Sequence, residues 1–384
     1  MISNVAPITI ARAEIFVFRA PVEEPVRTSF GVMHNRPAVL LRLEDKEGTH
    51  GWGEAWCNFP ACGAEHRARL LETVIVPLLL GKTWAKADDA FHQLTRQTAV
   101  LALQADEQGP LAQAIAAADI AVWDMFARKA QQPLFRYLGG SEVRAVPAYA
   151  SGINPLGVAE SIERSRAAGY RAFKVKIGFD QKRDLDNIKT VAGMLQSGER
   201  FGVDANQAWS LPEALNMAKL LADFPLMWLE EPLRCDVDLS QWELLRGNCA
   251  IPLAAGENMR SVHTFQRALL SQAFGVIQPD MCKWGGFTAC LPIAESILQA
   301  QIRYCPHYLG GGIGLVASAH LLAAAGGDGL LEVDSNPNPL RELLAQPYPA
   351  MRDGMFAMPQ EPGLGVEPAV HEVKDMKTLY LDMA

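Results

Sequence analysis

The chain has 384 residues, of which 49% are hydrophobic and 20% are charged, and its formal net charge is -8. This is the composition of a folded globular protein, and the length allows one large domain and a smaller one. The acidic balance argues against a protein that coats nucleic acid, because that mode of binding needs clustered Lys and Arg. A small-molecule function is therefore expected.

The seven cysteines show no C-x-x-C or Cys/His spacing typical of a zinc site. We interpret them as reduced thiols of a cytoplasmic protein. The apolar segment near the N-terminus carries Arg12, Glu14 and Arg19, so it is predicted to be neither an export signal nor a membrane span.

The N-terminal part, residues 1–140, is predicted to form a small α+β domain. Residues 8–18 and 38–43 resemble strands, and residues 49–56 are a short segment rich in Gly and Trp. Residues 88–103 and 111–129 repeat apolar side chains at helical spacing, so they are predicted to form two helices packed on those strands.

After Gly139-Gly140 the pattern changes to short apolar runs that alternate with capped amphipathic segments, which is typical of repeated βα units. We place a domain boundary near Ser141. Eight strands are predicted, at residues 145–150, 172–177, 201–205, 227–230, 253–255, 276–278, 302–305 and 330–333. Eight strands with helical connections favour an α/β fold of the closed (β/α)8 type, and no dinucleotide-binding glycine pattern follows the first strand.

The carboxyl ends of the strands form the working face of such a barrel. Each predicted strand after the first ends in polar side chains. They are Lys174 and Lys176, Asp204 and Asn206, Glu230 and Glu231, Glu257 and Asn258, Asp280 and Lys283, His307, and Glu332 and Asp334.

Three acidic residues, Asp204, Glu230 and Glu257, follow one another at about one βα repeat each. A single acid at a strand end could be a helix cap or a solvated loop residue. Three in register predict convergent oxygen ligands, which suit Mg²⁺ better than a metal that prefers sulfur or nitrogen. Glu231 should point away from its neighbour by strand alternation, so Glu230 is the preferred ligand.

Two lysines, Lys174 and Lys176, are two residues apart and should point to the same side of their strand. A surface strand would also explain this alternation, but helices cover the strands of a barrel. Beside a divalent cation an ammonium group loses its proton more easily, so a lysine here could act as a base.

His307 and Asp280 end neighbouring predicted strands and could form a hydrogen-bonded acid/base pair. A histidine without such a partner is more often structural. The glycine run at residues 310–314 lacks the Lys-Ser/Thr of a phosphate loop, which leaves a helix N-terminus where a substrate carboxylate could lie.

In this order and spacing, the motifs resemble the enolase superfamily and, within it, the mandelate racemase subgroup. The motifs are Lys174-Val-Lys176, Asp204-Ala-Asn206, Trp228-Leu-Glu-Glu-Pro232, Gly256-Glu-Asn258, Asp280-Met-Cys-Lys283, His307 and Leu331-Glu332. The resemblance implies a barrel at residues 141–340 and a capping domain at residues 1–140 that is completed by a returning segment at residues 341–384. It also suggests a homo-oligomer, either a dimer or an octamer.

The resemblance further implies a role for each site residue. Mg²⁺ would be held by Asp204, Glu230 and Glu257. Lys176 would be one base, and the His307/Asp280 pair would be the second acid/base on the opposite face of the substrate. Lys174 would hold the substrate carboxylate, and Glu332 would hydrogen-bond an enediolate oxygen. Asp280 stands where a lysine would mark the muconate-cycloisomerase and dipeptide-epimerase subgroup, which speaks against that subgroup.

The expected reaction is removal of the proton α to a carboxylate, with the developing charge stabilised electrostatically. Dehydration of an acid sugar to a 2-keto acid is the first hypothesis for the step that follows, and racemisation or epimerisation is the second. A barrel that only binds a metabolite is the third. A Schiff-base aldolase would need a lysine but no convergent carboxylates.

Substrate selection is expected from the capping loops at residues 28–34 and 52–60, together with Asn206 and Lys283. Phe30, His34, Trp56 and Phe59 could line a pocket there, or could pack the domain interface. Trp52 and Trp56 suggest a partly apolar pocket, which weakens the acid-sugar hypothesis.

Overall fold

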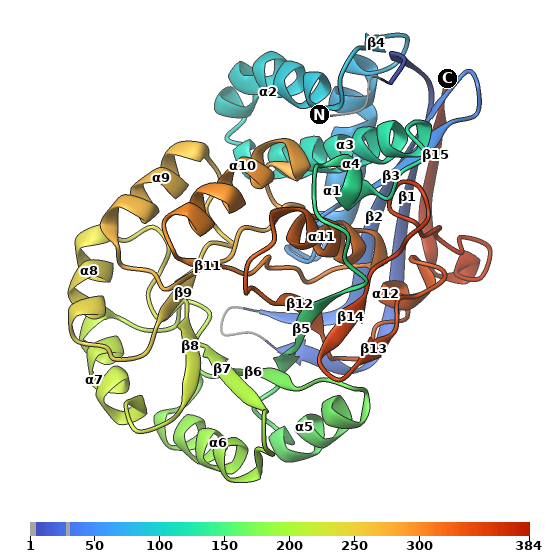
Figure 1. The fold of residues 1–384 in the computed structure, drawn as a ribbon. Coiled ribbons are helices and arrows are strands. Elements are labelled where there is room, and N and C mark those ends of the chain that lie inside the picture. The colour runs from blue at the N-terminus through green and yellow to red at the C-terminus, as the bar shows by residue number, and fades with distance from the viewer. Residues whose placement is uncertain (1–4, 28–30) are drawn as a thin grey trace.

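The computed structural model describes residues 5–27 and 31–384. Figure 1 shows a barrel ringed by helices, with a smaller unit of strands and helices packed beside it. Along the described residues, no helix is both long and apolar enough to cross a membrane.

An antiparallel sheet forms the smaller unit, with the strand order β15-β1-β2-β3. Its strands are β1 (Ile8–Arg27), β2 (Val32–Asp45), β3 (His50–Ala55) and β15 (Lys377–Met383), and the short β4 (Thr83–Trp84) pairs with the start of β1. β1 and β2 form a hairpin longer than predicted, with Pro21 still paired to Asn35. The last strand of the chain therefore lies beside the first, as the red and blue strands of Figure 1 show.

Among the described residues, four α-helices accompany this sheet. They are α1 (Gly63–Leu70), α2 (Ala87–Gln104), α3 (Gln108–Lys129) and α4 (Leu134–Tyr137). The second and third agree with the predicted helices. α3 approaches β3 so closely that a Cβ atom on Gly53 would lie 1.9 Å from the carbonyl oxygen of Ala117. Only glycine fits there, which explains the Gly-rich composition of β3.

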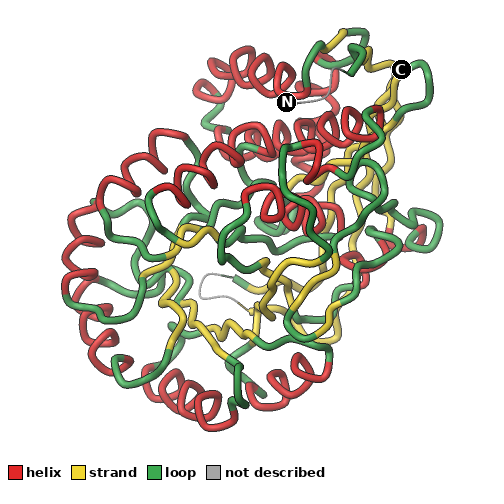
Figure 2. Tube along the Cα trace, in the orientation of Figure 1, coloured by secondary structure: helices red, strands yellow, loops and turns green. Residues whose placement is uncertain are grey.

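The barrel strands run parallel in the order β11-β10-β9-β8-β7-β6-β5, and β12 pairs with the other side of β5. Within the described residues they number eight. Their bounds are β5 (Ala145–Ile153), β6 (Ala172–Lys176), β7 (Arg200–Asp204), β8 (Leu226–Glu230), β9 (Leu253–Ala255), β10 (Val276–Ile277), β11 (Arg303–Tyr304) and β12 (Leu331–Asp334). Figure 2 shows these strands as the yellow inner ring. All eight predicted strands are present.

Helices cover the outside of the barrel (Figure 1). They are α5 (Val158–Ala167), α6 (Gln181–Met194), α7 (Leu211–Leu221), α8 (Leu239–Gly247), α9 (Val262–Ser271), α10 (Gly286–Gln299) and α11 (Gly312–Ala325). A capping box begins α7, because the Ser210 amide donates to Glu213 Oε2 at 2.8 Å. The expected (β/α)8 barrel with an N-terminal capping domain is confirmed.

An apolar layer fills the amino end of the barrel interior. It contains Tyr149 and Trp228, whose ring centroids lie 5.3 Å apart, with Val276 and Leu330 in the same cluster. Polar side chains occupy the interior above this layer. The site is therefore built at the carboxyl ends of the strands, as in other barrels of this type.

The segment after β12 differs from the simple return that the sequence predicted. It forms α12 (Pro339–Leu343) and a hairpin of β13 (Met351–Arg352) and β14 (Met355–Ala357) before reaching β15. β14 pairs antiparallel with β5, so this hairpin extends the barrel sheet rather than the capping sheet. The domain limits at residues 140 and 340 remain a prediction.

Candidate active site

Lys174 lies inside the barrel among acidic side chains. Its Nζ atom is 2.6 Å from Glu230 Oε1 and 2.7 Å from Glu332 Oε1, and the side chain is buried. Burial alone would lower the pKa of Lys174, but Glu230 and Glu332 raise it well above its ordinary value. Lys174 is therefore an ammonium group held below the mouth of the site.

Lys176 is the next inward-facing residue of β6 after Lys174, and it lies nearer to solvent. Its Nζ atom contacts Asp204 Oδ2 at 2.6 Å and Asn206 Oδ1 at 2.7 Å. Both lysines point into the barrel, as their spacing predicted. Lys176 differs from Lys174 in that it reaches the cavity at the mouth.

His307 follows β11, and Asp280 follows the neighbouring strand β10. His307 Nδ1 lies 2.7 Å from Asp280 Oδ2, and its Nε2 lies 2.8 Å from Glu257 Oε2. Burial would lower the pKa of His307, but Glu257, Glu332 and Asp280 together raise it well above its ordinary value. The predicted pair is thus formed, and the imidazole is held as a cation in this arrangement.

The three predicted metal ligands stand at the ends of the neighbouring strands β7, β8 and β9. Lys174 Nζ bridges two of them, since it lies 3.6 Å from Asp204 Oδ2 as well as next to Glu230. Glu257 is paired with His307 and with Lys283, whose Nζ is 2.9 Å from Oε1. Among residues 5–27 and 31–384, no three His, Cys, Asp or Glu side chains stand in a ready metal-binding arrangement.

The donor set nevertheless fits a hard divalent cation. All three groups are carboxylates, the ligands that Mg²⁺ prefers. Glu231, next to them, has a buried Oε2 atom without a hydrogen-bond partner. Burial, together with Glu257 and Asp204, raises the pKa of Glu231 well above its ordinary value, which shows how crowded the negative charge is here.

Three of the eight described non-glycine residues with a positive φ angle lie at the same strand ends. Asn206, Gln207 and Glu231 have φ angles of 43°, 64° and 38°, in the left-handed region that non-glycine residues rarely adopt. Such strain gathers at functional sites, where the surrounding structure holds it in place. Here it turns the chain sharply after β7 and β8.

A cavity of about 250 Å³ opens between the barrel mouth and the capping domain. Lys176 and His307 both line it, from different strands. Its other lining residues are Met33, Trp56, Asn58, Phe59, Asn206, Gln207, Glu257, Asn258, Lys283 and Leu309. Lys283 Nζ lies 4.7 Å from the centre of the Trp56 ring, so a cation is stacked on an aromatic wall.

The residues predicted to contact the substrate divide into four groups. Asn206, Lys283, Trp56 and Phe59 line the cavity. His34 is exposed and is not among the lining residues, where its neighbour Met33 stands instead. Phe30 lies outside the described residues. Lys174, predicted to hold the substrate carboxylate, is buried beneath the cavity rather than in its wall.

Several residues of the site were not singled out by the sequence reasoning. Asn58, Gln207 and Leu309 line the cavity, and Gln278 Nε2 donates to Glu230 Oε2 at 2.7 Å. Gln278 is two residues after the inward-facing Val276, so strand alternation could have predicted that Gln278 also points into the barrel. The loop residues Asn58 and Leu309 carry no such pattern.

The glycine run before α11 does not offer a free helix N-terminus, which corrects the expectation of a substrate carboxylate there. Glu54, on β3 of the capping domain, fills the position: its Oε1 accepts from the Gly311 amide at 2.6 Å and its Oε2 from the Gly314 amide at 2.9 Å. The anion that this helix end attracts is the protein's own.

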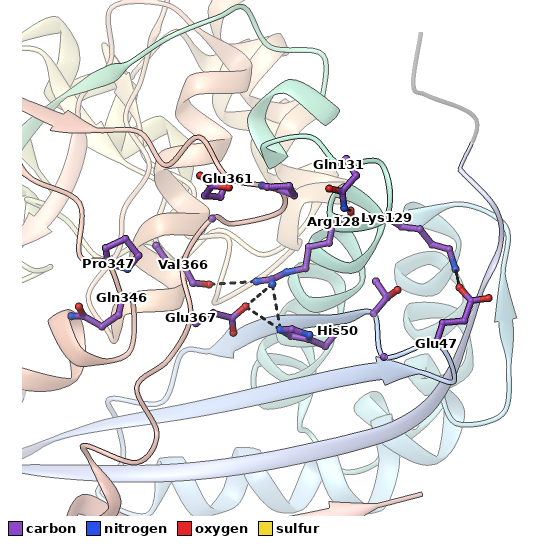
Figure 3. Close-up of a pocket in the computed structure, with 14 residues that line it drawn as sticks. Glu47, His50, Arg128, Lys129, Gln131, Gln346, Pro347, Glu361, Val366 and Glu367 are labelled. Carbon is purple, nitrogen blue, oxygen red and sulfur yellow. Dashed lines mark hydrogen bonds and ion pairs between the residues drawn. The ribbon is translucent and has the colours of Figure 1, made fainter.

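A larger cavity, of about 710 Å³, lies between the β2–β3 turn, the end of α3 and the C-terminal segment (Figure 3). Its cations are already paired within the protein. Arg128 contacts Asp124 and Glu367, and Lys129 contacts Asp45 and Glu47. The charged side chains of this cavity therefore link segments of the capping domain to one another.

Comparison with protein families matches both parts of the chain. Residues 12–139 match the mandelate racemase/muconate lactonizing enzyme N-terminal domain, and residues 157–373 match the enolase C-terminal domain-like family. The chain belongs to the mandelate racemase/muconate lactonizing enzyme family of the enolase superfamily. Its relatives are dehydratases, cycloisomerases and racemases, so this family member is a lyase or an isomerase.

Individual relatives cover nearly the whole chain. A D-galactarolactone cycloisomerase from Agrobacterium fabrum is 30% identical over 94% of this chain and 96% of its own length. An arabinonate dehydratase from Saccharolobus solfataricus is 27% identical over 86% of this chain and 88% of its own length.

Solved structures of family members superpose closely. A mandelate racemase/muconate lactonizing enzyme from Bordetella bronchiseptica is 50% identical, with a TM-score of 0.90 over 97% of this chain and 100% of that chain. A racemase from Streptomyces coelicolor with bound magnesium is 26% identical, with a TM-score of 0.84 over 96% of this chain and 100% of that chain.

Proposed function

We propose that this enzyme removes the proton α to the carboxylate of an acid sugar or a related hydroxy acid and then eliminates the β-oxygen, giving a 2-keto acid. The observation that carries the proposal is that Lys176 and the His307/Asp280 pair reach one cavity from different strands. A base and an acid on separate walls can act on two different bonds of one substrate.

Mg²⁺ would be held by Asp204, Glu230 and Glu257, and when bound it would stabilise the negative charge that develops on the substrate carboxylate. Crowded buried carboxylates and the unpartnered Glu231 Oε2 support this assignment. The magnesium bound to the Streptomyces coelicolor relative agrees with it.

The protein's own residues account for the proton transfers. Lys176 takes the α proton as the base, and the electrons of the C–H bond pass onto the carboxylate to give an enediolate. The enediolate electrons then form the double bond between the α and β carbons as the β C–O bond breaks. The imidazolium of His307 gives its proton to the departing hydroxyl, which leaves as water. The enol that remains tautomerises to the 2-keto acid. The Lys174–Glu332 ion pair lies beneath it in the barrel interior.

Ring opening is a second candidate, favoured by the cycloisomerase relative. If the β-oxygen belongs to a ring, the same elimination opens the ring and no water is lost. Racemisation or epimerisation, in which His307 returns a proton to the α carbon, is the third. A barrel without turnover, the remaining hypothesis, is disfavoured because the chain belongs to a family of enzymes.

The decisive experiment incubates the enzyme and Mg²⁺ with a library of aldonic acids, aldaric acids and their lactones in D2O. NMR detects α-deuterium exchange, and mass spectrometry detects 2-keto acids. A keto product that has lost water identifies dehydration, a keto product that has lost no water and has gained deuterium identifies ring opening, and exchange without a keto product identifies racemisation. Activity should vanish in Lys176→Ala and with EDTA, and should persist in His34→Ala. Turnover that survives Lys176→Ala would overturn the proposed base.

The substrate is expected to be a small carboxylate, and nucleic acid and membrane are not expected partners. A homo-oligomer, dimer or octamer, and a cytoplasmic location remain predictions from the sequence.

A further inference from the structure

We propose that two buried carboxylates of the capping domain, Glu54 and Asp119, are positioning residues for the His307/Asp280 half of the site. The inference rests on the proposed function for the role of His307. Neither carboxylate lines the cavity, so each would act through the loop that it holds.

Glu54 holds the loop that carries His307. Its carboxylate accepts the Gly311 and Gly314 amides at the start of α11, and its side chain is 2% exposed. Two glycines of this run have no room for a side chain: a Cβ atom on Gly311 would lie 2.6 Å from Glu54 Oε1, and one on Gly314 would lie 2.3 Å from the Tyr308 ring. The glycine run is therefore shaped to receive this side chain.

Asp119 makes the same kind of contact on the neighbouring helix, α10. Its Oδ1 accepts from Thr288 Oγ1 at 2.5 Å and its Oδ2 from the Thr288 amide at 3.1 Å. A Cβ atom on Gly286, at the first residue of α10, would lie 2.1 Å from Asp119 Oδ2. Trp123, also on α3, donates to Thr288 Oγ1 at 2.8 Å and completes the contact.

Both helix ends lie a few residues after a member of the acid/base pair. His307 precedes Gly311 by four residues, and between them the Tyr308 amide donates to Glu332 Oε2 at 3.1 Å. Asp280 precedes Gly286 by six residues, and the Gly286 amide donates to the Met281 carbonyl at 3.1 Å. A shift of either helix start would therefore move a member of the pair or its support.

The capping segment after Glu54 adds two further links. The Trp56 amide donates to the Cys282 carbonyl at 3.2 Å, and Asn58 Nδ2 donates to the Leu309 carbonyl at 2.8 Å. One short segment thus touches both loops. Burial raises the pKa of Glu54, and the hydrogen bonds from the Gly311 and Gly314 amides oppose that rise.

The Lys176 half of the site is supported differently. The loop after β6 is held by the barrel itself, since the Gly178 amide donates to Asp184 Oδ2 at 2.8 Å and the Ile177 amide to the Asp204 carbonyl at 2.9 Å. Loosening the capping contacts should therefore disturb His307 and leave Lys176 in place.

The test compares Glu54→Gln with the matched control Asp124→Asn. Asp124 is an equally buried capping carboxylate that accepts the Trp52 and Leu364 amides at 2.9 and 2.7 Å, but those contacts do not involve the catalytic loops. Hydrogen–deuterium exchange read by mass spectrometry follows the amides of residues 305–316, with no substrate needed. We expect the His307 and Tyr308 amides to exchange at least about tenfold faster in Glu54→Gln, and at the wild-type rate in Asp124→Asn.

Kinetics with the acid identified under the proposed function provide the second readout. We expect kcat to fall about 10- to 100-fold in Glu54→Gln with KM within about twofold, as for other residues that orient a catalytic group. Unchanged protection of Tyr308, or an unchanged kcat despite faster exchange, would overturn the proposal. If wild-type enzyme turns over none of the acids, the proposed function is at fault, and the exchange result still decides whether Glu54 holds the His307 loop. Should Glu54→Gln not fold, Asp119→Asn tests the Asp280 side in the same way.

Discussion

His307 Nδ1 lies 2.7 Å from Asp280 Oδ2, while Asp280 Oδ1 accepts the Cys282 and Lys283 amides at 2.9 and 3.0 Å. The aspartate is thus fixed by backbone on one side and fixes the imidazole on the other. We predict that Asp280→Asn lowers kcat about 100- to 10,000-fold, because the amide cannot stabilise the imidazolium. Steady-state kinetics would measure this, with Mg²⁺ affinity by calorimetry as the control for folding. A kcat within threefold of wild type would contradict the role of the pair.

The adjacent acids Glu230 and Glu231 differ in their surroundings, and this difference predicts which one binds metal. Glu230 faces the barrel interior beside Lys174, whereas Glu231 contacts Asn258 Nδ2 at 2.9 Å. We predict that Glu230→Gln weakens Mg²⁺ binding at least about 100-fold, and that Glu231→Gln weakens it less, since a neighbour of a ligand typically costs about 10- to 100-fold. Calorimetric titration of both variants decides the matter, and the reverse order of affinities would assign the metal to Glu231.

The aromatic wall of the cavity gives a prediction about substrate affinity. Trp56 packs against the ammonium of Lys283 with 4.7 Å between Nζ and the ring centre. Trp56→Leu removes a contact worth about 0.5 to 2 kcal/mol that holds the Lys283 ammonium in the cavity wall, so we expect KM to rise by at most about 2- to 30-fold, with a smaller change in kcat. His34→Ala is the control, because His34 is exposed and is not a lining residue. An equal rise of KM in both variants would mean that the loop, rather than the Trp56 ring, sets affinity.

Much of this fold could be predicted because its signals are periodic. Alternation placed Lys174 and Lys176 on one face of β6, and the repeat of βα units placed Asp204 and Glu230 on neighbouring strands. Such patterns follow from local geometry and need no knowledge of distant partners.

Contacts between segments far apart in the sequence could not be predicted in this way. The sequence marks the glycine run near Gly311 as a place for an anion, but only the fold shows that Glu54, more than 250 residues earlier, supplies it. In the same way, the strands β13 and β14 are too short to show a clear alternation of apolar and polar residues. Their pairing with β5 depends on which part of that strand the barrel leaves unpaired. Cavity walls made from loops, such as Asn58, share this limit.

His320, on α11, gives a prediction about stability and pH. Its Nδ1 accepts the Phe135 amide at 3.1 Å and its Nε2 donates to the Leu364 carbonyl at 3.0 Å, so the neutral ring is fully satisfied inside the protein. Burial lowers the pKa of His320 from 6.5 to about 4. In the unfolded chain, His320 therefore binds a proton below about pH 6.5, whereas in the folded protein it binds one only below about pH 4.

It follows that the free energy of unfolding should fall as the pH is lowered from 6.5 to 4, with His320 contributing roughly 3 kcal/mol of that fall and nothing further below pH 4. Urea unfolding at a fixed protein concentration across this range measures it. His320→Gln is the matched variant, because a glutamine amide can accept from Phe135 and donate to Leu364 without titrating. We expect the variant to lose less stability than wild type between pH 6.5 and 4. Parallel pH profiles for the two proteins would show that this histidine does not couple folding to pH, and that the acid sensitivity comes from other groups.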